Sequence, residues 1–179
     1  MSLLLAEAVA DKTMAYLRAN SDEKVADVSR RFEAEVDLPT FAKYSIADPE
    51  FLGLTLNDLP AVFVMPNDSD LEFTFGDGAA ISTHRFQIAV IAFGLAENGE
   101  AAAETAKRAS MRYLLAVVEM LREMHSHSDT TYHVNGGTIH WGSDEQPWRL
   151  LYPIMRSLGS GEYVADARLE VGVEHTEAL

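Results

Sequence analysis

The chain has 179 residues, no cysteine, and 28 acidic against 14 basic side chains, a formal net charge of −14 at pH 7. The missing cysteine excludes disulfides, thiolate metal sites and a cysteine nucleophile. The acidic charge argues against proteins that hold nucleic acid or anionic membranes by electrostatic attraction. A hydrophobic content of 47% is that of an ordinary folded protein, and we expect a single domain over residues 1–179.

No targeting or membrane segment is expected. The opening MSLLLAEAVADK lacks the basic region of a secretory signal. The longest apolar run, residues 88–96, is far shorter than the roughly 20 residues that a membrane span requires. We therefore expect a protein that works in water.

The first 59 residues predict helix followed by irregular structure. Apolar residues recur at helical spacing over about residues 2–19. Asn20 and Ser21 are expected to end this helix, and Ser21 to cap a second, short one. From residue 37 the periodicity fails, and scattered prolines and aromatics indicate an ordered connection packed by its own rings. Residues 20–59 are therefore expected to form an irregular arm or insertion.

Three strands are predicted next. Residues 61–65, AVFVM, are β-branched and aromatic, and residues 71–75 alternate apolar with polar side chains before a glycine-rich turn. In a third strand, residues 83–94, the second half is apolar on both faces, so both must be covered by this chain or by a neighbour. One of these faces is a candidate buried sheet face or subunit interface, and it carries Ala89, Ile91 and Phe93.

A long helix is predicted over about residues 99–125. Asn98 can cap it, and Glu100 near its start and Arg122 near its end match the helix dipole. Its predicted apolar stripe consists of Met111, Leu114, Leu115, Val118, Leu121 and Met124.

The remaining chain predicts closing strands. Residues 133–140 hold an Asn-Gly turn between β-prone residues, which is typical of a hairpin. Residues 162–174 alternate apolar with charged side chains and predict a strand with one buried face. Helix, strands, long helix and strands together indicate an α+β fold.

Four of the six histidines lie in residues 125–140 and form a candidate metal site. If the hairpin turns at its Asn-Gly pair, His133 faces Thr138, and His140 lies diagonally on the same face, about 7–8 Å away between backbones. His133 and His140 are then candidate metal ligands for a small metal-binding or metal-dependent enzyme. The histidine spacing matches neither HxxxH nor HExxH.

The alternative interpretation of the histidines is structural. His125 and His127 would decorate a helix C-terminus, where cations are favoured, and the hairpin pair would be surface. The serines, GDGAA and NGG show no triad, nucleophile elbow or phosphate-binding fingerprint. Since the spacing favours the structural interpretation, we expect no enzyme, no cofactor and no metal.

The order of these elements resembles the tail terminator proteins of long-tailed bacteriophages, also called tail completion or head-to-tail joining proteins. The resemblance covers about residues 60–175 and the first helix. It is carried by LPAVFVM, LEFTFGDG, THRFQIAVIAFG, the helix from Asn98 to Met124 and the closing ADARLEVGVEH. It implies a small, mainly antiparallel sheet flanked by the N-terminal helix and the helix at 99–125.

The resemblance also implies a function. Family members are structural virion proteins that form a homo-oligomeric, hexameric ring at the tail–neck junction, after assembly in the host cytoplasm. The ring caps the tail tube protein, ends its polymerisation and joins the tail to neck or head–tail connector proteins. DNA passes through without specific binding, which a charge of −14 suits. Another neck or tail-completion protein of the same architecture is the nearest alternative, and an acidic dimeric module that binds a small ligand is a more distant one.

Four acidic side chains near the second strand are candidates for the lumen or rim of such a ring. These are Asp68, Asp70, Glu72 and Asp77. The alternative is an ordinary solvated face.

Overall fold

The computed structural model describes residues 2–32, 38–49, 53–67, 74–76, 79–94, 99–126, 133–134, 137–142, 148–159 and 162–178. The helices in these ranges are α1 (Ser2–Arg31), the 3₁₀ helix η2 (Leu56–Asp58) and α2 (Gly99–Ser126). The strands are β1 (Lys43–Ser45), β2 (Ala61–Pro66), β3 (Thr74–Gly76), β4 (Ala79–Gly94), β5 (His133–Val134), β6 (Gly137–Trp141), β7 (Arg149–Gly159) and β8 (Glu162–Ala178).

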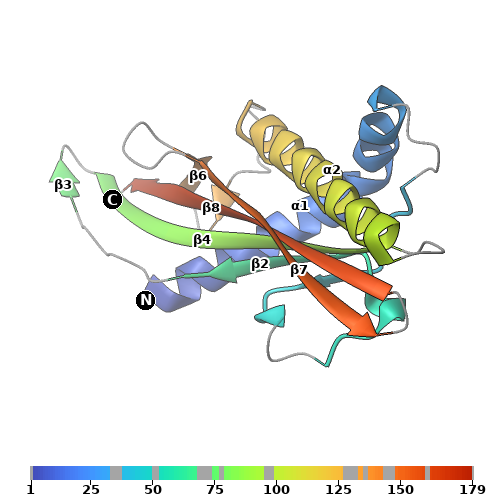
Figure 1. Ribbon diagram of the computed structural model, residues 1–179. Helices are drawn as coiled ribbons and strands as arrows, with labels where there is room; N and C mark the ends of the chain where they lie inside the picture. Colours follow the sequence, from blue (N-terminus) through green and yellow to red (C-terminus); the bar gives the residue numbers. More distant parts are fainter. Residues whose placement is uncertain are drawn as a thin grey trace.

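In the described ranges the strands form one sheet in the order β1-β2-β4-β8-β6-β5, with β3 added to β4 and β7 added to β8. Only β1 and β2 are parallel; the other pairs are antiparallel. Both long helices lie over the same face of this sheet (Figure 1). The expected α+β fold with a mainly antiparallel sheet is confirmed.

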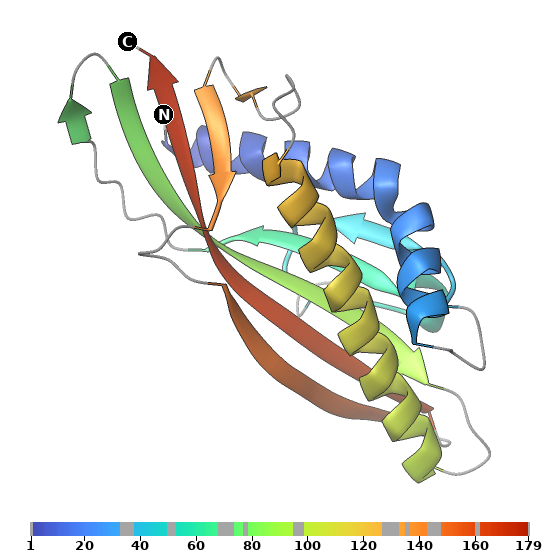
Figure 2. The same cartoon turned by 90° about the horizontal axis from the view of Figure 1, so that it is seen from above.

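The long pair β4–β8 is the axis of the sheet. It runs from Ala79 opposite Ala178 to Gly94 opposite Tyr163, over all 16 residues of β4. Strands β6 and β7 pair with successive parts of β8, and β3 and β2 with successive parts of β4. The end that carries β3 and the C-terminus extends beyond α2 (Figure 2).

Helix α1 does not end where the sequence predicted. It continues through Asn20 and Ser21 to Arg31 and bends in its second half (Figure 2). The two residues expected to end this helix have other partners: Asn20 Nδ2 donates to the Tyr16 carbonyl at 2.8 Å, and the Ser21 hydroxyl hydrogen-bonds the Tyr44 hydroxyl. Because neither side chain caps a helix start, the predicted break at these residues is wrong.

The segment after α1 is ordered by aromatic rings. Phe41 packs on Tyr44 at 5.8 Å and on Tyr113 of α2 at 5.0 Å between ring centroids. The buried Tyr113 hydroxyl donates to the Pro39 carbonyl at 2.6 Å. Within residues 38–49 this is the packing by aromatics that the sequence indicated. The contacts with Tyr113 also join residues 38–49 to α2.

Apolar side chains are buried on both faces of the sheet. The helix-covered face holds the larger core, including Phe86, Ile88 and Leu169. The other face holds a smaller core, including Phe63 and Ile91, which the Leu54–Leu59 stretch covers. The expectation that the second half of β4 is covered on both sides is confirmed.

Strand β8 differs from its predicted one-sided pattern. In its first half Val164 and Asp166 are buried as well as Ala165 and Ala167. Val164 and Asp166 are buried because Leu59, in the smaller core, packs against the face of β8 that the sequence pattern predicted to be exposed to solvent.

Strand β7 was not predicted. It contains Pro153, which lacks a backbone N–H, and its register with β8 shifts between Leu151 and Ile154. Proline is tolerated in a sheet at bulges and on edge strands, and β7 offers both. The bulge also breaks the alternation by which a strand is recognised.

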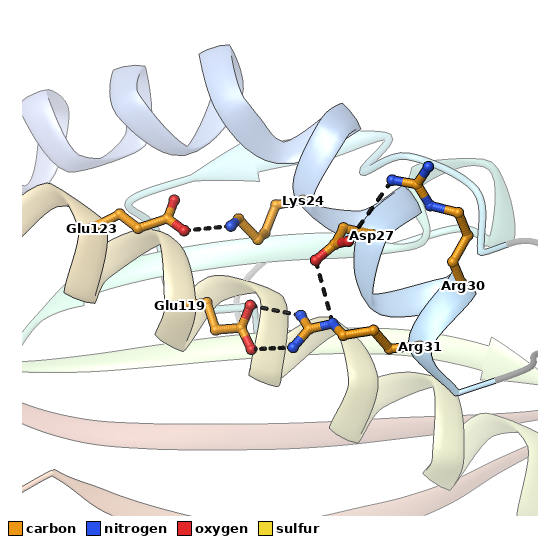
Figure 3. Close-up of polar contacts among 6 residues, drawn as sticks. All are labelled: Lys24, Asp27, Arg30, Arg31, Glu119 and Glu123. Atoms are coloured by element: carbon orange, nitrogen blue, oxygen red, sulfur yellow. Dashed lines mark hydrogen bonds and ion pairs between the residues drawn. The ribbon is translucent and has the colours of Figure 1, made fainter.

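Helices α1 and α2 are joined by ion pairs (Figure 3). Arg31 donates two hydrogen bonds to Glu119, at 2.9 and 2.6 Å, and also contacts Asp27 at 3.3 Å. Lys24 is paired with Glu123 one helical turn further along α2. These contacts hold the second half of α1 against α2.

The Arg31–Glu119 pair makes the stability of the fold depend on pH. The hydrogen bonds from Arg31 hold the pKa of Glu119 below its ordinary value of 4.5. A carboxylate with a depressed folded-state pKa stabilises the fold above its unfolded pKa, and the effect is lost as the pH falls through the folded value. We expect Glu119→Gln to cost less than about 1 kcal/mol at pH 7, because the pair is partly exposed.

Urea unfolding of both proteins at pH 7 and near pH 3.5 tests this, since protonation makes Glu119 resemble glutamine. The difference in unfolding free energy between wild type and Glu119→Gln should be smaller at the lower pH. A gap of constant size would contradict the assignment.

Candidate interaction surface

The apolar residues of α2 belong to two different faces. Leu114, Leu121 and Met124 are buried in the core, whereas Leu115 and Val118 are only partly buried against it and Met111 is exposed. Successive helical residues turn by about 100°, which places these three opposite the buried Tyr113 and Met120. The predicted apolar stripe is therefore wider than the buried face of α2, and its outer half is only partly covered.

The outer half lines an apolar groove of about 590 Å³ between the end of α1 and strand β7. Its lining residues are Phe32, Glu104, Lys107, Arg108, Met111, Arg112, Leu114, Leu115, Val118 and Leu150. Phe32 is 49% exposed, Met111 37% and Leu150 56%. Ile154, further along β7, is 53% exposed. Contiguous exposed apolar side chains of this size are typical of a protein–protein contact.

Sequence reasoning missed most of this groove. Phe32, Met111 and Leu150 are far apart in the chain, and only the packing of α1 and β7 beside α2 brings them together. One sign was available: residues 149–151, RLL, follow a tryptophan and have too few polar residues for a surface loop.

The rim of the groove is basic. Three cations line it, Lys107, Arg108 and Arg112, against one carboxylate, Glu104, which leaves a net charge of +2. Arg108 is ion-paired with Glu104, and the Arg112 guanidinium lies 5.6 Å from the Phe32 ring centroid. The groove is thus a small basic region on a chain of charge −14.

A second cavity, of about 340 Å³, lies on the other face of the sheet. Its polar wall is a buried pair in β8: Arg168 donates to Asp166 at 3.1 and 2.6 Å, and to Gln87 at 2.9 Å. The two side chains are 14% and 5% exposed. Because Arg168 and Asp166 are already paired with one another, we interpret this cavity as the space around a satisfied ion pair.

The candidate interface face of β4 lies beside this cavity. Ala89 and Ile91 are buried in the smaller core, and Phe93 is half-buried against it. Within one copy of the chain, these side chains pack against Phe63 and Val164, so they do not form an open surface.

Asp68, Asp70, Glu72 and Asp77 lie outside the described residues.

His133 pairs with Thr138 in the β5–β6 hairpin, as predicted, and His140 of β6 lies opposite Glu174 of β8. The predicted turn residues, Asn135 and Gly136, lie outside the described part of the chain. Over the residues that the structure does describe, no three His, Asp or Glu side chains come together as a metal site would require. In the same ranges, neither α1 nor α2 is long and apolar enough to cross a membrane.

No protein-family model matches the sequence, and no curated protein is significantly similar to it. Among solved structures, a chain of the "Virion of native gene transfer agent (GTA) particle" superposes with a TM-score of 0.42 at 16% identity, over 95% of this chain and 97% of that chain. A likeness of that degree identifies neither a fold family nor a function.

Proposed function

We propose that this chain is a structural virion protein of a phage-like particle that forms a hexameric ring, caps the tail tube, ends its polymerisation and joins the tail to the neck. The observation that carries the proposal is the exposed apolar groove over α2, rimmed by β7 and the end of α1. A strongly acidic chain whose described residues include an exposed apolar surface of this kind is suited to bind another protein there.

Two further features support a ring. The order of helix, strands, long helix and strands that carries the resemblance is the order in the fold. The net charge of −14 suits a passage for DNA, since basic contacts would bind phosphate and slow its movement. In this proposal Asp68, Asp70, Glu72 and Asp77 lie at the lumen or rim of the ring. Residues 38–59 add a contact for the tube or the neck. The partners are the tail tube protein and neck or connector proteins.

The test is capping of tail tubes assembled from the tube protein of the same particle, with negative-stain images and light scattering. The wild-type protein should give rings on tube ends and tubes of limited length. Met111→Asp/Leu150→Asp should weaken capping at least about tenfold, because burial of each side chain contributes about 1.5–3 kcal/mol. A matched control is Ala15→Asp/Ala26→Asp, which makes the same charge change on the exposed side of α1.

Two results would contradict the proposal. One is a wild-type protein that stays monomeric in the presence of tubes and leaves their length unchanged. The other is an equal loss of capping in the groove variant and the α1 control, since general repulsion and not the groove would then explain it.

A further inference from the structure

The groove over α2 has two chemical requirements for an occupant. Its floor is apolar, formed by Met111, Leu115 and Val118, and it needs side chains that will leave water. Its rim carries a net charge of +2 and favours carboxylates. The occupant should therefore be both apolar and acidic.

One stretch of this chain combines these properties. Residues 68–77 hold the acids Asp68, Asp70, Glu72 and Asp77, interleaved with Leu71, Phe73 and Phe75. No lysine or arginine occurs between Lys43 and Arg85, so no cation of this stretch would oppose the basic rim. Charge and hydrophobicity both match the groove.

Strand β3, the part of this stretch that the structure describes, does not lie beside the groove of its own copy. Strand β3, residues 74–76, pairs with Ala79–Ile81 at the start of β4, whereas the groove lies over α2 towards the opposite end of the sheet. Both views show β3 beyond the helices, away from the start of α2 and from β7 (Figures 1 and 2). The full β4 strand of 16 residues spans on the order of 50 Å. A contact between the two is therefore a contact between copies.

We infer that the groove over α2 of one copy receives residues 68–77 of a second copy. This inference rests on the proposed ring and names its subunit contact. The groove and residues 68–77 are different surfaces, so the contact is head-to-tail: each copy gives its residues 68–77 to one neighbour and receives those of the other neighbour. Such contacts close into a ring when the rotation between neighbours allows it.

A charge exchange tests the electrostatic half. We expect two double variants to weaken assembly at least about tenfold each at low salt: Lys107→Glu/Arg108→Glu in the groove, and Asp70→Lys/Glu72→Lys in residues 68–77. A chain that carries all four changes should recover to within about threefold of wild type, because the charges are again opposite. Arg18→Glu/Arg85→Glu and Glu7→Lys/Asp11→Lys make the same charge changes at exposed positions that do not line the groove, and they are the matched controls. Circular dichroism and thermal melting identify any variant that does not fold.

Cysteine cross-linking tests the apolar part of the proposed contact between copies, and it does so without depending on charge. The chain has no cysteine, so any disulfide must join introduced residues. Met111→Cys and Phe73→Cys proteins, mixed under mild oxidation, should give a covalent dimer of one of each. The combined variant should give a ladder that ends at the ring size. Ala15→Cys replaces Met111→Cys in the control mixture and should give no such product.

The outcomes separate the contact from the function. Rings that form on tubes without cross-linking, and without rescue by the fourfold variant, overturn this contact and leave the ring standing. Cross-linked ladders from a protein that never caps a tube confirm the contact and overturn the proposed function. Rescue together with the ladder supports both.

Discussion

Replacement of Gly94 by alanine is expected to destabilise the fold by about 3 kcal/mol. Gly94 ends β4 where α2 crosses it, and an added Cβ would lie 2.2 Å from the Ala102 carbonyl oxygen and 2.5 Å from the Ala106 amide nitrogen. Both are backbone atoms inside a helix, so neither can turn aside as a flexible side chain would. Strand and helix would have to separate, with loss of packing along α2.

Urea unfolding followed by circular dichroism measures this loss. Gly53→Ala is the control, because a Cβ there meets nothing within 4 Å, and it should change stability by less than about 0.5 kcal/mol. Equal stability of Gly94→Ala and wild type would mean that α2 does not approach β4 so closely.

Removal of one partner of the buried pair in β8 is expected to be nearly as costly. Asp166→Ala takes away the carboxylate that accepts hydrogen bonds from Nε and a terminal nitrogen of Arg168. The guanidinium then stays buried with its charge uncompensated by that carboxylate, which costs about 3 kcal/mol. Chemical unfolding should show this loss at neutral pH.

The double variant Asp166→Leu/Arg168→Leu separates the cost of an unpaired charge from the value of the pair. A buried ion pair replaced by apolar side chains of similar size is often neutral or stabilising. We expect the double variant to lie within about 1 kcal/mol of wild type. If it is as unstable as Asp166→Ala, the pair itself contributes the stability.

The elements that could be predicted were those whose pattern is set by their own sequence. Helix α2 and strand β2 match their predicted ranges within a residue or two, because helical periodicity and β-branched runs act locally. The β5–β6 register followed from a turn signal in the same way. These features depend little on what packs against them.

The errors arose where distant parts of the chain decide the outcome. Ser21 would cap a helix in isolation, but Tyr44 engages its hydroxyl and the helix continues. Pro153 argues against a strand until β7 is seen to be an edge strand with a bulge. In the candidate site, apolar spacing placed Met111 in the stripe. Only the positions of α1 and β7 show that it faces a groove and not the core.

The long β4–β8 pair has a mechanical consequence. Hydrogen bonds of an antiparallel ladder run perpendicular to the strands. A force that pulls β4 and β8 past one another therefore loads all 16 paired positions together, whereas a force that peels them apart breaks the ladder step by step. Tension along the strand axis is the direction in which this fold resists best.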